Sequence, residues 1–149
     1  RMLVLVGSPI HPFGNYEETA RRRSLSEKVL CPGRLSTNDL QLLYSFTELF
    51  VFPSLYEGFG MPVLEAMACG APVVTSNSTA LAEVAGDAAV LVDPQDARAL
   101  GEAMVRALED EPLRAGLKIK GFARAKQFSW EQAAVKTIAL YRELCGETV

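Results

Sequence analysis

The chain has 149 residues, of which 49% are hydrophobic and 22% charged, and its formal net charge is −3. This length and apolar content suffice for one sizeable hydrophobic core, so we expect a single domain over residues 1–149. The weakly acidic balance provides no electrostatic footprint for nucleic acid or for an acidic membrane surface, which excludes nucleic acid as an expected partner.

Three cysteines, Cys31, Cys69 and Cys145, are widely spaced and include no CxxC pair. This odd and dispersed set favours buried thiols in a reducing compartment and contains no evident zinc site. No apolar run reaches membrane-spanning length, and the first residues lack the pattern of a signal peptide. We therefore expect a cytoplasmic protein, with peripheral membrane association of a fuller protein left open.

Short apolar runs alternate with polar segments in the first third of the chain. Residues 2–6 are apolar and end at a glycine, which predicts a buried parallel strand. The pattern then predicts a helix over residues 16–23, a strand over 28–31 and a helix over 38–46. His11 is the only histidine, and its place in a Pro-containing loop indicates a surface group.

The middle of the chain, residues 50–76, has the pattern of a strand, a loop, a helix and a second strand. Pro62 is suited to the first helical turn because its missing N–H would have no partner there. The helix should therefore begin at residue 61 or 62. Gly70 and Pro72 should end it, since glycine adopts the left-handed conformation readily and proline cannot continue a helix.

Two carboxylates flank the start of this helix. Glu57 should lie on the loop, and Glu65 should point out from the helix. The unpaired N–H groups of a first helical turn form an anion site, and Gly58 and Gly60 let backbone N–H groups approach a phosphate closely. A ligand with both phosphates and sugar hydroxyls would account for this combination: Glu65 could bind ribose and Glu57 a second sugar.

The last part of the chain continues the alternation. A capped helix should run from the loop at residues 76–79 to residue 85, followed by a strand over 88–92. Helices follow from residue 95 onward, with a break at residues 111–112 and a last helix over 129–144 that has one apolar face. The whole pattern predicts an α/β, Rossmann-like parallel sheet with helices on both faces, which binds ligands at the carboxyl ends of its strands.

The segments YEGFGMPVLEAMACGAPVV, residues 56–74, and EVAGDAAVLVDP, residues 83–94, resemble a known family. They are similar to the donor-binding domain of group 1 retaining glycosyltransferases, which join two Rossmann-like domains in the GT-B architecture. The family signature is a Glu, seven residues and a second Glu, placed as Glu57 and Glu65 are here. The similarity extends from about Val29 to Trp130.

The resemblance implies a nucleotide-diphosphate sugar as donor and retaining transfer of its sugar to an acceptor hydroxyl of unknown identity. The helix N-terminus and basic groups would stabilise the leaving diphosphate, with no metal and no other cofactor required. Glu57 would act as the catalytic residue by orienting the donor sugar, with a covalent nucleophile as the alternative role. The implied donor-binding residues are Gly58, Phe59, Gly60, Met61, Val63, Leu64 and Glu65 around the loop, and Gly33, Arg34 and Leu35 in an earlier turn.

Some alternatives stay open. Arg34 could contact the base, reach the pyrophosphate with its bidentate fork, or be merely exposed. Family members also carry a further strand with an Arg and a Lys that neutralise the diphosphate, and an N-terminal acceptor domain. Both are absent from this sequence, so we expect it to be truncated at its N-terminus and inactive alone, with a surface exposed for the missing domain or for self-association.

Two other functions compete with transfer. The first is a non-catalytic nucleotide-binding or protein-interaction module derived from such a domain. The second is a non-hydrolysing epimerase, against which the EGFGMP loop of residues 57–62 argues.

Overall fold

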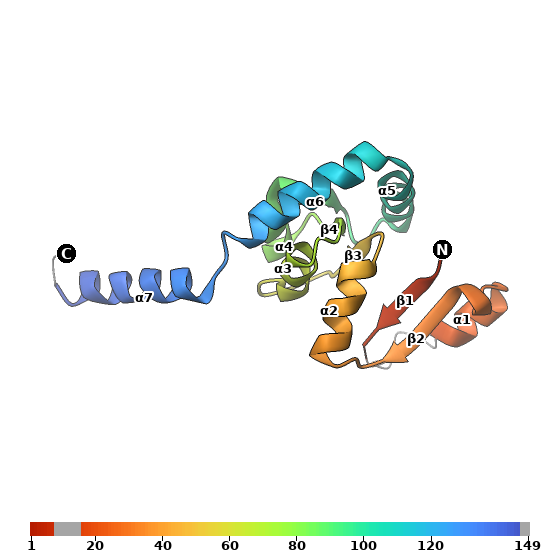
Figure 1. The fold of residues 1–149 in the computed structure, drawn as a ribbon, viewed down its shortest axis with the longest axis horizontal. Helices are drawn as coiled ribbons and strands as arrows, with labels where there is room; N and C mark the ends of the chain where they lie inside the picture. Colours follow the sequence, from red (N-terminus) through yellow and green to blue (C-terminus); the bar gives the residue numbers. More distant parts are fainter. Residues whose placement is uncertain (8–15, 147–149) are drawn as a thin grey trace. The chain divides into compact units, whose positions relative to one another are not determined.

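The computed structural model describes residues 1–7 and 16–146, so His11 lies outside the described residues. The elements follow the predicted alternation (Figure 1). In chain order they are β1 (Leu3–Val6), α1 (Tyr16–Arg22), η1 (Ser26–Lys28), β2 (Val29–Gly33), α2 (Thr37–Phe46), β3 (Phe50–Phe52), α3 (Met61–Ala68), β4 (Val73–Ser76), α4 (Thr79–Ala85), η2 (Gly86–Ala88), β5 (Val90–Val92), α5 (Ala97–Glu109), α6 (Glu111–Ala125) and α7 (Trp130–Leu144).

The chain forms two compact units, Arg1–Leu42 and Leu43–Val149. In the first unit, β1 and β2 pair in parallel, with Leu3 opposite Val29. None of the residues of these two strands is buried. Ala20 on α1 is the only buried hydrophobic residue among the described residues of this unit. The expectation of a single domain stays a prediction.

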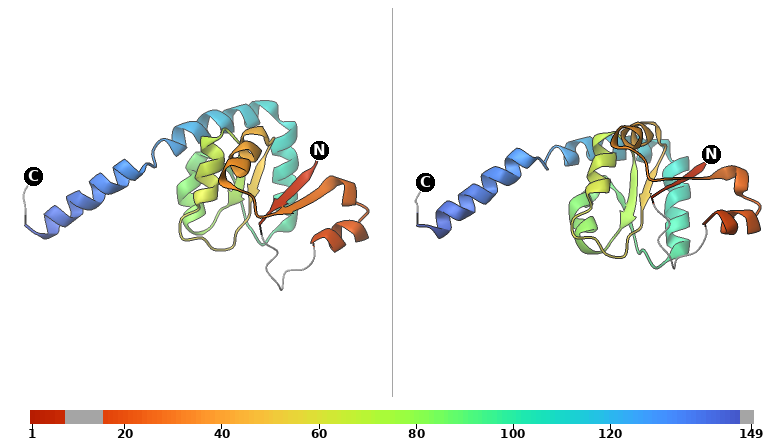
Figure 2. Two further views of the ribbon diagram at one scale, coloured as in Figure 1. Left: turned by 60° about the horizontal axis from the view of Figure 1, so that its bottom comes forward. Right: turned by 90° about the horizontal axis from the view of Figure 1, so that it is seen from below.

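The second unit contains a three-stranded parallel sheet in the order β3-β4-β5. Phe50 pairs with Val73 and Val74 with Val90, so β4 is the central strand. Figure 2 shows these strands between α3 and α4 on one side and α5 on the other. Because helices cover both faces, all four residues of β4 are buried, which is the pattern of a parallel strand. The predicted α/β class is thereby confirmed.

The core of the second unit has a part on each face of the sheet. On the α5 face, Val74 and Val92 pack with Ala107 of α5. Among the largest fully buried side chains elsewhere in the unit are Met67 of α3 and Leu81 of α4. Helix α6 packs on α3.

Side-chain caps define several helix ends. Asp96 accepts hydrogen bonds from the backbone N–H groups of Arg98 and Ala99 at the start of α5. Asp110 accepts one from Leu113 and separates α5 from α6, close to the predicted break. Ser78 is different: it precedes α4, but its hydroxyl makes no cap hydrogen bond, so the expected side-chain cap is wrong.

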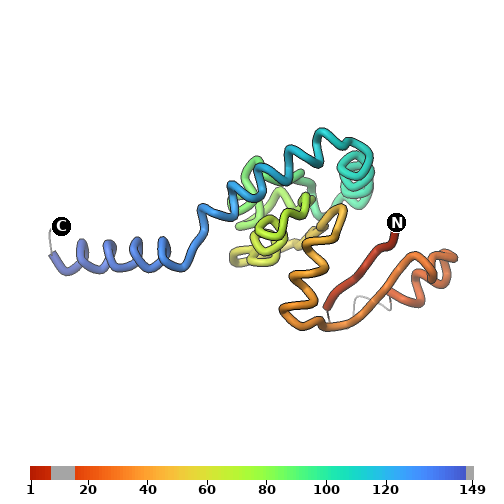
Figure 3. Tube along the Cα trace, in the orientation of Figure 1, coloured from red at the N-terminus to blue at the C-terminus, as the bar shows by residue number. Residues whose placement is uncertain are grey.

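Helix α7 follows α6 along the chain (Figure 3) and has no buried residue. Its exposed large hydrophobic side chains are Trp130, Val135, Ile138, Leu140, Tyr141 and Leu144. The apolar face of this last helix is therefore uncovered, as expected. No helix in the described part of the chain is long and apolar enough to cross a membrane.

The cysteines differ from the sequence-based expectation of buried thiols. Cys145 is exposed just after α7, and Cys31 and Cys69 are only half-buried. Cys31 lies on β2, whose strand pair has no buried residue. Cys145 follows a helix that buries nothing, so neither site offers the apolar cover that the expectation required.

Candidate functional site

The site begins where β3 ends. The buried hydroxyl of Thr75 donates a hydrogen bond to the Phe52 carbonyl, at 2.8 Å, and the buried hydroxyl of Ser76 donates one to the Ser54 carbonyl, at 2.5 Å. Ser54 in turn donates to the carbonyl of Tyr56. These bonds connect the end of β3 and the start of the loop of residues 53–60 to β4. They fix the direction in which the loop leaves the carboxyl edge of the sheet.

Gly60 determines how the loop enters α3. Its φ of 101° and ψ of 41° are left-handed, and a Cβ added there would lie 2.5 Å from Cδ2 of the buried Leu81. Only glycine fits this combination without strain. The Gly60 carbonyl accepts a hydrogen bond from the Val63 N–H at 3.0 Å, and Pro62 occupies the first turn. The predicted helix start is confirmed.

The backbone of this loop offers hydrogen-bond donors. The backbone N–H groups of Gly58, Phe59 and Gly60 donate no hydrogen bond to a backbone carbonyl of the described residues. They precede a helix N-terminus that has no side-chain cap. Unpaired N–H groups with the positive end of a helix dipole favour an anionic ligand. A phosphate is the ordinary biological ligand for such an arrangement.

The two glutamates lie where the sequence predicted. Glu57 is half-buried on the loop, and Glu65 is exposed on α3. Burial raises the pKa of the Tyr44 phenol to about 12, and the charges of Glu65 and Cys69 add to the effect. Tyr44 therefore stays protonated at neutral pH, with its hydroxyl able to donate a hydrogen bond.

The other predicted contact residues differ in accessibility. Phe59 and Met61 are 44% and 43% exposed, so a ligand can touch both residues. Val63 and Leu64 are buried, and their side chains belong to the core. Any contact of these two residues with a ligand would go through the backbone.

The predicted turn lies at the carboxyl end of β2 in the first unit. Gly33 is the last residue of β2, with a φ of +76°. Arg34 is exposed and Leu35 half-buried. The assignment of these three residues to the donor site stays a prediction, and for Arg34 the alternatives remain those stated above.

Sequence reasoning missed the residues that hold the loop from outside it. These are Ser76, Leu81 and Phe128. A serine or threonine at the end of a buried strand could have indicated Ser76, because a buried hydroxyl requires a partner. No local pattern indicates Phe128, whose ring packs against Phe59.

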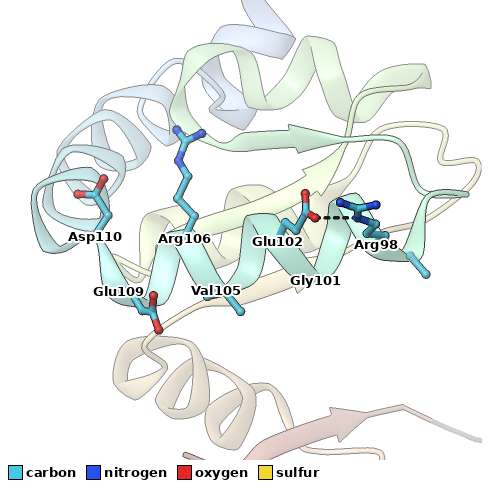
Figure 4. Close-up of a pocket in the computed structure, with 8 residues that line it drawn as sticks. Arg98, Gly101, Glu102, Val105, Arg106, Glu109 and Asp110 are labelled. Atoms are coloured by element: carbon cyan, nitrogen blue, oxygen red, sulfur yellow. Dashed lines mark hydrogen bonds and ion pairs between the residues drawn. The ribbon is translucent and has the colours of Figure 1, made fainter.

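A separate open hollow runs along α5 and contains none of the predicted site residues (Figure 4). Its polar side chains include Arg98 and Glu102, which form an ion pair at 2.8 Å. Among the described residues, including those of this hollow, no group of three His, Cys, Asp or Glu side chains is placed to hold a metal ion. The expectation that no metal is required stays a prediction.

Known proteins share both the sequence and the fold. The family described as "Glycosyl transferases group 1" matches residues 1–124. The O-antigen chain mannosyltransferase B of Escherichia coli is 47% identical over 112 residues, which are 75% of this chain and 29% of that protein. The chain thus spans less than a third of the length of this relative.

Solved structures agree with the sequence match. Sucrose-phosphate synthase from Thermosynechococcus elongatus superimposes with a TM-score of 0.82 at 34% identity, over 99% of this chain and 39% of that one. HepE from Anabaena, solved in complex with UDP-glucose, gives 0.75 at 25% identity, over 85% of this chain and 36% of that one. The chain belongs to the group 1 glycosyltransferase family and has the α/β fold of its GT-B members.

Proposed function

We propose that this chain is the donor-binding part of a retaining glycosyltransferase that takes a nucleotide-diphosphate sugar. The observation that carries the proposal is the loop of residues 57–60, whose free N–H groups precede the N-terminus of α3 with a carboxylate on either side. The HepE structure with UDP-glucose supports this class of donor. Mannosyl transfer by the Escherichia coli relative makes a mannosyl donor the first to test.

Each part of the site has a role in this reaction. The diphosphate binds the N–H groups of Gly58 to Gly60, where the helix dipole stabilises the negative charge that grows as the glycosidic bond breaks. Glu65, exposed on α3, accepts hydrogen bonds from the ribose hydroxyls. Glu57 orients the donor sugar from the loop. The reaction needs no metal ion for charge stabilisation if the backbone and basic groups of the whole enzyme supply it.

Calorimetric titration with UDP, GDP and ADP, each with and without an attached hexose, tests donor binding. The parent chain should bind one nucleotide, and Glu65→Ala should weaken that binding roughly ten- to a hundredfold, the usual value of hydrogen bonds to a charged group. Glu109→Ala, which removes an exposed glutamate of α5, is the matched control and should bind like the parent. Equal affinities of the parent and Glu65→Ala would remove Glu65 from the site.

The role of Glu57 needs a different comparison. Glu57→Ala should bind the bare nucleotide like the parent and lose roughly tenfold in its preference for the nucleotide sugar, because only the sugar contact is removed. An unchanged preference would exclude this role. Absence of binding by every nucleotide would instead favour an interaction module, which the uncovered apolar face of α7 also suits.

A further inference from the structure

The donor loop is in contact with an aromatic ring from the far end of the chain. The rings of Phe59 and Phe128 meet edge to face, with centroids 5.8 Å apart and planes at 79°. Phe59 is the central residue between the two glycines of the loop. Phe128 lies in the short segment between α6 and α7. Edge-to-face pairs have a preferred geometry, so the position of one ring restricts the other.

Phe128 is itself held in place by Arg124. The guanidinium of Arg124 lies over the Phe128 ring, 5.0 Å from its centroid. The same group donates hydrogen bonds to the carbonyls of Val84, at 2.9 Å, and Glu83, at 2.6 Å. These carbonyls belong to the last turn of α4, where backbone acceptors lack partners within the helix. Arg124 thus fixes both α4 and the ring against which Phe59 rests.

The loop also contacts α4 directly. Gly60 lies directly against Leu81 of α4, since a Cβ at Gly60 would be 2.5 Å from the Leu81 side chain. The loop is therefore held at two adjacent residues, Gly60 by Leu81 and Phe59 by Phe128. Without Phe128, Phe59 would lose its aromatic partner, and the side-chain contact of Leu81 beside Gly60 would remain for these N–H groups.

We propose that Phe128, held by Arg124, is a positioning residue for the donor loop: it fixes Phe59 and thereby aims the N–H groups of Gly58 to Gly60 at the diphosphate. The ligand in this statement rests on the proposed function, whereas the ordering of the loop does not.

The experiment compares Phe128→Leu with Phe128→Tyr in the 149-residue chain. Backbone 15N order parameters of residues 58–60 should fall in Phe128→Leu from about 0.85 toward 0.6 or below, and the tyrosine should restore them because it keeps the ring. Affinity for the nucleoside diphosphate that binds the parent should fall roughly two- to tenfold in Phe128→Leu, the usual value of an aromatic pair.

Phe122→Leu is the matched control. Phe122 lies on α6, six residues before Phe128, and its ring packs beside Gly70, just past the opposite end of α3 from the loop. This control should leave the order parameters of the loop and the affinity unchanged. The proposal is overturned if Phe128→Leu leaves the loop ordered, if Phe122→Leu disturbs it equally, or if a disordered loop binds the nucleotide as tightly as the parent.

The experiment distinguishes a failure of the proposed donor-binding function from a failure of the positioning role of Phe128. If the parent binds no nucleoside diphosphate, the proposed function fails, while the order parameters still decide whether Phe128 orders the loop. Arg124→Lys tests the second link, because a lysine keeps the charge but cannot donate to two carbonyls with a planar fork. It should disorder the loop in the same direction as Phe128→Leu, and an unchanged loop would exclude Arg124 from the arrangement.

Discussion

The two parallel sheets of this chain are covered to very different extents. Every residue of β4 is buried, since α3 and α4 cover one face of its sheet and α5 the other. The β1–β2 pair has no buried residue, and its unit contributes one buried hydrophobic residue, Ala20, among those described. Parallel pairing of strands therefore does not by itself bury their side chains. The stability of this chain should reside in the second unit, which also holds the loop of the candidate site.

Removing a core side chain from the second unit should have the largest effect. Met67→Ala should lower the free energy of unfolding by about 2–5 kcal/mol, because Met67 is fully buried and its loss leaves a cavity. Leu30→Ala on β2 should cost less than about 1 kcal/mol, since Leu30 is half exposed. Urea unfolding followed by circular dichroism measures both. Equal costs would contradict the difference between the two sheets.

The free energy of unfolding of the second unit should also fall at alkaline pH, because of the buried phenol of Tyr44. Tyr44 packs edge to face on Phe50 of β3, and burial raises its pKa to about 12 from 10.0. The folded state therefore favours the protonated phenol. This contribution is fully present below about pH 10 and is lost as the pH rises through about 12, by at most roughly 2–3 kcal/mol.

Urea unfolding of the parent and of Tyr44→Phe at increasing pH isolates this contribution. The difference between the two proteins should change only above about pH 10, because all other titrating groups are shared. Glu65→Gln should reduce the change, since it removes one of the charges that raise the Tyr44 pKa. A difference that stays constant through pH 12 would contradict the burial of this phenol.

Alanine substitutions at two glycines of the same loop should differ in their effect on stability, because only one of the two positions has a strained backbone and a close neighbour. Gly60→Ala should lower stability by about 1–3 kcal/mol, because its φ is positive and its Cβ would meet the buried Leu81. At Gly58 an added Cβ meets nothing within 4 Å, so Gly58→Ala should change stability by less than about 0.5 kcal/mol. Thermal unfolding compares them. Gly60→Ala should cost less in a Leu81→Ala background than in the parent, because only the steric part of its cost is removed there.

The smallest effect is expected at an exposed ion pair of the second unit. Lys120 and Asp87 lie 2.8 Å apart and are both exposed. The hydrogen bond from Lys120, together with its charge, lowers the pKa of Asp87. The pair's contribution is therefore present at neutral pH and lost as the pH falls through that lowered pKa, but solvent screens it. Asp87→Asn should leave the urea midpoint unchanged within error. A clear shift of the midpoint would show that the pair stabilises the fold although both side chains are exposed.

Local sequence signals predicted the central unit well. Pro62 and Gly70 placed the ends of α3 correctly, because their backbone preferences act within a few residues. Glu57 and Glu65 were placed on the loop and the helix for the same reason. The glycine of the left-handed turn, Gly60, was also identified as a loop residue, though its contact with Leu81 was not.

Contacts between distant segments could not be predicted in this way. The Phe59–Phe128 pair depends on where α6 ends relative to α3, which no periodicity encodes. The capping of α4 failed as a prediction because Ser78 has the right residue type but its hydroxyl does not bond the helix backbone. Likewise, Cys145 is exposed because it follows a helix, α7, that has no buried residue, and its own sequence context does not reveal this.

The parallel direction of the strands has a consequence for how the chain folds. Phe50 pairs with Val73, and Val74 with Val90, so each pairing in this sheet spans a crossover helix and no hairpin joins neighbouring strands. Two loops must close before the central strand gains its partners, which slows folding relative to a helical bundle. Helix α7 needs no such closure and can form within about a microsecond. Refolding should therefore show helical signal before β4 is protected.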